Sequence, residues 1–299
     1  MVRKTRPVDV VEAPAERYDE MIDLAMRRSP ALIRAFVEPL FHDPDFTLES
    51  RFVVALDGDR MLGWGGLAKL APFPPGWRSL RVVVDAEQEG AGVGSALHAV
   101  LVDGIDDDLV LRSGVFDDEP RALEVAQHWG FGILQHSISS RLPLPSPVPE
   151  RALPDDVTIE ASTNLEFPDQ DAFDAMLDAS QTNPERDQFV FDRAMLLDFI
   201  TGKERPLGVL LRVRGRPAAI SWGSAFGDQA HIGYTGVDPA FRGRGLGYLV
   251  KQEIHRLAYD AGARTCATDN EEHNSGIRHV NEALGYAKVS GSYWMQRPI

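Results

Sequence analysis

The amino-acid sequence predicts an α+β fold that occurs twice in the chain, each time as a central twisted mixed sheet flanked by helices. Three observations lead to this expectation. A glycine-rich stretch occurs in both halves, strand and helix patterns alternate, and a proline-rich stretch lies near the middle. At 299 residues, with 43% apolar and 25% charged residues, the chain has the length and composition for two globular domains.

An internal repeat supports the duplication. The stretch VDAEQEGAGVG (84–94) matches VDPAFRGRGLG (237–247), 153 residues later, at the valine, the aspartate and three glycines. A second match pairs residues 130–144 with residues 285–299, 155 residues later. The same order with a drifting offset is typical of a duplicated domain with small loop changes.

The division between the copies falls in a proline-rich stretch. Residues 142–154 contain five prolines, which disfavour a helix and favour an extended, semi-rigid spacer. We therefore expect an N-terminal domain over residues 1–145, a linker over residues 146–156 and a C-terminal domain over residues 157–299.

The first elements of the second half follow from local patterns. Residues 157–162 predict a short strand, and helical spacing of apolar residues predicts helices over 169–181 and 192–202. Apolar runs over 207–228 predict a hairpin that turns at Arg214-Gly215.

Glycines mark the boundaries of the later elements. Residues 231–238 predict a strand, and helical spacing over 246–258 predicts a helix that ends at Gly262. The remaining patterns predict a strand over 264–270, a helix over 273–285 and a strand or hairpin over 286–296. The first half fits the same order of strands and helices, with less distinct boundaries between them.

Charge and cysteine content narrow the class of protein. The 31 basic and 45 acidic residues give a net charge of −14, which argues against nucleic acid as a partner. The negative charge either keeps the surface soluble or mildly favours a cationic substrate such as an amine. No apolar run is long enough to span a membrane, and the basic N-terminal residues lack the apolar region of a secretory signal. The single cysteine, Cys266, fits a reducing cytoplasm and excludes a zinc site with several cysteine ligands. We expect a cytoplasmic protein without a metal.

The stretch from Val237 to Gly247 places a glycine-rich turn between a strand and a helix. Glycines allow the backbone amides to approach a ligand, and the start of a helix adds partial positive charge. The pattern therefore predicts a diphosphate cradle that Arg242 closes. Because neither a Walker lysine nor the G-x-G-x-x-G spacing is present, NAD and Walker-type ATP binding are not expected.

Arg242-x-x-Gly245-x-Gly247, preceded by Val237-Asp238-Pro239, resembles the acyl-CoA motif of the GNAT superfamily of N-acyltransferases. The resemblance implies that acetyl-CoA is the acyl donor and that the strand ending at Val237 is splayed from its neighbour. It also implies that Thr235 and Val237 contact the pantetheine and that the Val237 amide polarises the thioester carbonyl. The residues implied in binding the donor's diphosphate are Arg242, Gly243, Arg244, Gly245, Gly247 and Tyr248.

A second marker lies near the C-terminus, where Asn274 and Leu284-Gly285-Tyr286 resemble the Asn and Leu-Gly-Phe positions of the same superfamily. The residue seven after Asn274 is Asn281, where many members have a tyrosine that protonates the leaving thiolate. An asparagine can donate a hydrogen bond to sulfur but is not a useful acid. The alternative for both asparagines is helix capping and internal hydrogen bonding.

Transfer to an amine needs a base. His231 lies six residues before Val237, where members of the superfamily carry a glutamate or a histidine, and a histidine titrates near neutrality. The alternative is a surface histidine at the start of a strand. Asp269 is a second candidate for the base, and Cys266 is either a covalent nucleophile or buried filler.

The first copy has lost the chemical groups of the motif. Glu89, Ala91 and Ala126 occupy the positions of Arg242, Arg244 and Asn281, and Arg78 occupies that of His231. We expect a degenerate N-terminal domain that keeps the fold and lines the acceptor pocket or imitates a dimer partner.

The sequence therefore predicts an acetyl-CoA-dependent N-acetyltransferase that acts by direct attack of a primary amine of a small molecule. Two alternatives stay open. One is a transferase like mycothiol synthase, which is also a tandem GNAT protein, and the other is a non-catalytic CoA-binding protein. We expect a monomer or a homodimer.

Overall fold

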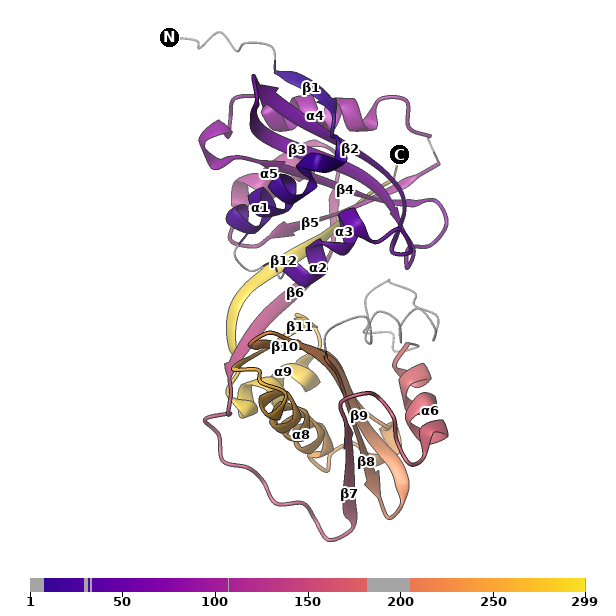
Figure 1. Cartoon of the computed structure of the whole chain (residues 1–299). Helices are drawn as coiled ribbons and strands as arrows, with labels where there is room; N and C mark the ends of the chain where they lie inside the picture. Colours follow the sequence, from indigo (N-terminus) through magenta and orange to yellow (C-terminus); the bar gives the residue numbers. More distant parts are fainter. Residues whose placement is uncertain (1–7, 30–31, 33, 107, 182–204, 299) are drawn as a thin grey trace. The chain divides into compact units, whose positions relative to one another are not determined.

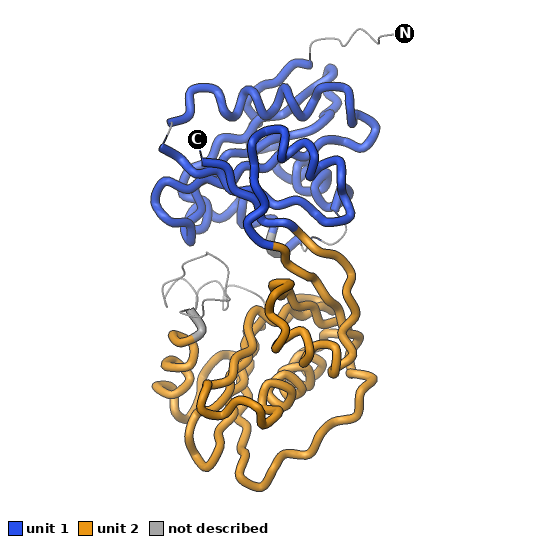
Figure 2. Tube along the Cα trace, turned by 180° about the vertical axis from the view of Figure 1, so that it is seen from behind, with its two compact units in different colours: residues 1–135, 293–299 blue, residues 136–292 orange. Residues whose placement is uncertain are grey.

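The computed structural model describes residues 8–29, 32, 34–106, 108–181 and 205–298 (Figure 1). The chain forms two compact units (Figure 2). Unit 1 contains the residues up to 135 together with 293–299, and unit 2 contains residues 136–292. Within the described ranges, no helix is long and apolar enough to cross a membrane.

Unit 1 is a sheet with helices on both faces. Its strands follow the order β1-β2-β3-β4-β5-β12-β6. Its elements are β1 (Asp9–Glu12), α1 (Tyr18–Arg28), α2 (Arg34–Val37), α3 (Pro39–His42), β2 (Thr47–Asp57), β3 (Arg60–Leu70), β4 (Trp77–Val84), α4 (Val93–Val102), β5 (Val110–Phe116), α5 (Pro120–His128), the start of β6 (Gly132–Pro143) and the end of β12 (Ala287–Pro298), with 3₁₀ turns η1 (Ala15–Arg17) and η2 (Ala86–Gln88).

Unit 2 repeats this architecture, with the strand order β12-β6-β11-β10-β9-β8-β7. Its elements are the end of β6, β7 (Val157–Ser162), α6 (Gln170–Gln181), β8 (Arg205–Val213), β9 (Arg216–Phe226), β10 (Gln229–Val237), η3 (Pro239–Phe241), α8 (Leu246–Asp260), β11 (Thr265–Glu271), α9 (Ser275–Leu284) and the start of β12 (Ala287–Pro298).

The α+β fold class is confirmed, and the described strands follow the same order in both units, with a helix before the last two strands of each. The expected helix over 192–202 lies outside the described residues. The stretch over 286–296 forms part of one long strand, β12, which begins in unit 2 and ends in unit 1. Residues 293–299, which the sequence placed with the second domain, are therefore part of unit 1. The domain boundaries at 145 and 157 stay a prediction.

Each sheet buries an apolar core on both faces. In unit 1, α4 contributes Leu97 and Leu101 to one core, whereas α1 contributes Met21 and Leu24 to another. In unit 2, α8 packs on one face of the sheet, and α6 buries Phe173 and Leu177 on the other. Because the sheet lies between two helical layers, its central strands are apolar on both faces.

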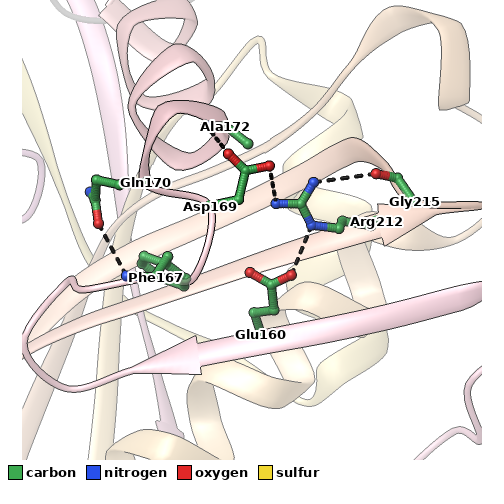
Figure 3. Close-up of polar contacts among 7 residues, drawn as sticks. All are labelled: Glu160, Phe167, Asp169, Gln170, Ala172, Arg212 and Gly215. Atoms are coloured by element: carbon green, nitrogen blue, oxygen red, sulfur yellow. Dashed lines mark hydrogen bonds and ion pairs between the residues drawn. The ribbon is translucent and has the colours of Figure 1, made fainter.

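A polar cluster ties the segment before α6 to the sheet (Figure 3). The Arg212 guanidinium on β8 donates to Glu160 on β7 at 2.8 Å and to Asp169 at 2.9 Å. Asp169 in turn accepts from the Ala172 amide at 3.1 Å. Because Arg212 is buried, two carboxylates compensate the cost of removing its charge from water.

In both units the sheet opens where a parallel pair of strands separates. In unit 2 the parallel pairing of β10 with β11 stops at Ile232↔Thr268, although β10 continues to Val237. In unit 1 the pairing of β4 with β5 stops at Ser79↔Arg112, although β4 continues to Val84. The gap between β10 and β11 beyond Ile232 is called the β10–β11 gap below.

Candidate active site

The glycine-rich turn of unit 2 is shaped by its own residues. The Asp238 carboxylate accepts a hydrogen bond from the Ala240 amide at 2.8 Å and caps η3. Gly243 and Gly245 follow with φ values of 77° and 75°, a left-handed conformation that side chains disfavour. A Cβ atom at either glycine would meet no described atom within 4 Å, so the space above the turn is open.

The turn ends at the first residues of α8. The first amides of a helix have no partner within it and carry partial positive charge, which favours an anion. Arg242 and Arg244 are exposed beside them. The Arg242 side chain forms no ion pair with the described residues, whereas Arg244 donates to both oxygens of Asp156, at 2.9 and 3.0 Å. Of these two arginines, Arg242 is therefore the one whose charge is not paired with another described residue.

Gly247 and Tyr248 lie on the packed side of the turn. A Cβ atom at Gly247 would be 3.5 Å from a methyl group of Val237, so the glycine brings α8 close to β10. Tyr248 is buried, the Arg151 guanidinium lies 3.7 Å from its ring centre, and its amide donates to the Gly245 carbonyl. Tyr248 thus packs in the core, and its part in binding a diphosphate stays a prediction.

The backbone of β10 directs amides into the β10–β11 gap. The Asp238 amide donates to the Ala218 carbonyl on β9. Along an antiparallel strand, the N–H groups of successive residues point alternately toward one neighbouring strand and away from it. The amides of Val237 and Thr235 therefore point away from β9, toward the gap. The Thr235 hydroxyl also contacts the Ser221 hydroxyl at 2.9 Å.

His231 and Asp269, the two sequence candidates for a base, are joined. The His231 Nε2 atom lies 2.8 Å from the Asp269 carboxylate, which also accepts from the Ser139 hydroxyl. Partial burial alone would raise the pKa of Asp269, but hydrogen bonds from His231 and Ser139 outweigh it and lower the pKa. Asp269 is therefore charged at neutral pH and orients the imidazole.

The two asparagines are engaged within the protein. The Asn274 side chain accepts from the Ile277 amide at 3.2 Å and caps α9. Asn281 is buried, its carbonyl accepts from the Lys251 ammonium, and its amide donates to the Asn270 carbonyl. Internal hydrogen bonding is thus seen for both residues.

Lys251 was missed by the sequence reasoning. It has no exposed surface, and burial lowers its pKa to about 7. The available signal was its place on the apolar side of α8, four residues before the buried His255. This spacing puts two basic side chains on one helix face.

Cys266 is the other buried reactive group. Burial raises the pKa of its thiol to about 11, and its sulfur lies 3.2 Å from the Tyr286 hydroxyl. A protonated thiol is a poor nucleophile, so this environment favours the packing alternative. Among the described residues, no three histidine, cysteine, aspartate or glutamate side chains are grouped to hold a metal ion.

The turn of unit 1 has the same backbone but different contacts. Glu89 takes the place of Arg242 and pairs with Arg28 at 2.6 Å and with Arg121 at 3.7 Å. A Cβ atom at Gly90 would lie 2.6 Å from the Arg121 guanidinium, so a side chain covers this turn. Arg78, which the sequence repeat aligns with His231, pairs with Glu49 at 3.2 Å. The bulge in β10 between Ile232 and Tyr234 shifts the alignment by one residue and puts Ser79 at the structural position of His231.

Comparison with known proteins agrees with this architecture. Residues 160–267 match the family model described as the acetyltransferase (GNAT) domain. No curated protein matches the sequence.

Solved structures resemble the chain over nearly its whole length. A GCN5-related N-acetyltransferase from Sphaerobacter thermophilus is 16% identical, with a TM-score of 0.74, over 97% of this chain and 95% of that one. A tandem GNAT protein from the clavulanic acid biosynthesis pathway is 20% identical, with a TM-score of 0.72, over 97% and 98%. A Drosophila protein is 17% identical, with a TM-score of 0.62, over the same shares. At these identities the likeness shows the fold.

Proposed function

Because the chain carries a GNAT acetyltransferase domain over residues 160–267, we propose that it transfers an acetyl group from acetyl-CoA to a primary amine of a small molecule. One observation supports the proposal most. The β10–β11 gap of unit 2 has an open, positively charged turn at the end of β10 and a His231–Asp269 pair beside its beginning. An acyl transfer needs both an anchor for the donor and a base for the acceptor.

The donor's diphosphate fits the turn. The open space above Gly243 and Gly245 admits a ligand, the first amides of α8 face an anion, and Arg242 supplies charge. The amides of Thr235 and Val237 are directed into the gap, where they would donate to the pantetheine and to the thioester carbonyl. Asn274, which caps the start of α9, stays a proposed contact of acetyl-CoA.

His231 would accept the proton of the attacking amine. With the Nε2–H group donating to Asp269, the Nδ1 atom is the basic nitrogen. The negative charge of Asp269 stabilises the imidazolium that forms. The amine nitrogen then attacks the acetyl carbon directly, without an acyl-enzyme intermediate.

The acceptor is proposed to be a small cationic amine. The net charge of −14 favours the approach of a cation. The Asp269 carboxylate, which is about half exposed, adds local negative charge beside His231.

The first test is acetyl-CoA binding to the full chain, measured by calorimetry. Arg242→Glu is expected to weaken binding by at least about tenfold, because it replaces a charge-assisted contact with repulsion. Arg121→Glu makes the same change beside the turn of unit 1 and should leave the affinity unchanged. If the wild-type chain fails to bind acetyl-CoA, the proposal is wrong.

The second test is release of free CoA from acetyl-CoA across a panel of primary amines, followed by thiol detection. The panel includes a cysteinyl glucosamine-inositol acceptor, since the mycothiol synthase alternative requires it. We expect release with at least one small amine. Tight binding without release for any amine would favour a non-catalytic CoA-binding protein.

A further inference from the structure

A buried polar chain lies on the helical side of the β10–β11 gap. Lys251 on α8 has no exposed surface and donates a hydrogen bond to Asn281 on α9. Asn281 is 4% exposed and donates to Asn270 on β11. The chain therefore links three separate elements of unit 2.

The lysine fixes the orientation of the Asn281 amide. An ammonium group can only donate hydrogen bonds, so the Asn281 oxygen must face Lys251. The Asn281 nitrogen must then face Asn270, and one of its two N–H groups donates to the Asn270 carbonyl. The second N–H is a donor whose polarity the adjacent positive charge increases.

The chain reaches the gap on the face opposite to His231. Successive residues of a strand point to opposite faces, and Cys266 faces the core under α8. Thr268 and Asn270 lie on that same face, and Asn270 is two residues beyond the last β10–β11 pair. Asp269, which pairs with His231, lies on the other face. Two polar systems thus flank the gap from opposite sides.

The first copy lacks every member of this chain. The strand register, counted through the bulge in β10 between Ile232 and Tyr234, places Val115 where β11 has Asn270. The repeat places His98 and Ala126 at the positions of Lys251 and Asn281. Since both copies keep the fold, the fold itself does not require the polar chain.

We propose that Lys251 is a positioning residue of this transferase, holding the Asn281 amide as a hydrogen-bond donor to the thiolate that leaves the acetyl group. The inference rests on the proposed function. In the transfer, the nitrogen–carbon bond forms, the carbon–sulfur bond breaks, and its electron pair stays on sulfur. His231 takes the amine proton, so CoA leaves as a thiolate and needs no acid from the protein.

The surroundings of Lys251 allow its charge to respond to the thiolate. Burial lowers its pKa to about 7, whereas Cys266 on β11 opposes this. The Tyr286 ring, after α9, lies 4.7 Å from the ammonium. A negatively charged sulfur nearby would favour the protonated form of Lys251, and the charge of the lysine would in turn stabilise the thiolate.

The test is the pKa of the CoA thiol when CoA is bound to the full chain, measured by the ultraviolet absorbance of the thiolate. Lys251→Met removes the charge at similar size and is expected to raise the bound thiol pKa by about one unit, which is about tenfold in the thiolate equilibrium. Asn281→Asp keeps a partner for Lys251 but removes the donor, and it should raise the thiol pKa as well. His98→Met changes the matched position in unit 1 and should have no effect.

Melting curves and the affinity for CoA show that each variant is folded and loaded. If folded Lys251→Met and Asn281→Asp both bind CoA with the wild-type thiol pKa, the positioning role is overturned while the proposed function stands. If one folds poorly, the other decides. If wild-type chain does not bind CoA, the proposed function fails first, and the inference falls with it.

Discussion

The two glycine-rich turns have nearly the same backbone and opposite charge. Glu89 has φ and ψ of −60° and 137°, and Arg242 has −61° and 161°. In both turns an aspartate accepts from an amide two residues later, and two glycines are left-handed: Asp85, Gly90 and Gly92 in unit 1, and Asp238, Gly243 and Gly245 in unit 2. Local sequence preserves the turn, whereas the side chain at one position differs in charge: Glu89 pairs with arginines of unit 1, and Arg242 is exposed in unit 2.

The same contrast extends to the groups around each gap. Unit 2 places His231 against Asp269, whereas unit 1 places Arg78 against Glu49. A guanidinium stays protonated at any physiological pH, so Arg78 cannot accept a proton. The difference teaches that the duplicated fold and the proposed chemistry are separable, and the predictions below test this contrast between the two copies.

The largest effect is expected at the proposed base. His231→Ala should lower kcat/KM for acetyl transfer by about 100- to 10,000-fold, because it removes the group proposed to accept the amine proton. Steady-state kinetics with an amine found in the panel measure this change. Arg78→Ala in unit 1 should leave kcat/KM near the wild-type value, and equal losses for both variants would contradict the assignment.

The next effect concerns the left-handed glycines. Gly245→Ala and Gly92→Ala should each destabilise the chain by about 1–2 kcal/mol, since a Cβ atom is disfavoured at φ values of 75° and 88°. Urea unfolding measures both losses. Only Gly245→Ala should also weaken acetyl-CoA binding in calorimetry. A binding loss of the same size for Gly92→Ala would mean that both turns take part.

A smaller effect should follow pH. The pKa of Asp269 is lowered in the folded chain, so its contribution to stability is present above the unfolded pKa of about 4 and is lost as pH falls through the folded pKa. Asp269→Asn should therefore lose less stability than wild type on acidification from about pH 6 to pH 3. Urea unfolding at each pH tests this.

The control for the pH series is Glu16→Gln, which changes an exposed carboxylate of unit 1. It should follow the wild-type curve. If Asp269→Asn also follows that curve, the pair with His231 does not contribute to stability as the geometry indicates.

The smallest effect is expected at Glu89. Glu89→Arg breaks its ion pairs with Arg28 and Arg121, which are partly exposed, and should cost about 1 kcal/mol or less. Because Arg121 covers the turn at Gly90, the change should not create a second acetyl-CoA site. Calorimetry should still give one acetyl-CoA site per chain. Two sites would show that the charge of Glu89 alone prevents binding at the turn of unit 1.

Several features of this protein were determined by its sequence alone. The repeat, the order of strands and helices in unit 2 and the left-handed glycines depend on residues near one another in the chain. Alternation, helical spacing and glycine placement act over a few residues, so they can be recognised without the fold. The GNAT resemblance also depends on residues near one another in the chain, in the short stretches around Arg242 and Asn274.

Other features were decided only by the tertiary structure. His231 and Asp269 meet because β10 and β11 pair in one register, and Lys251 reaches Asn281 because α8 and α9 pack together. Likewise, β12 begins in unit 2 and ends in unit 1. Each of these contacts joins segments distant in sequence, and burial then sets properties such as the lowered pKa of Lys251. No local pattern encodes which distant side chains will share a buried, weakly polar environment.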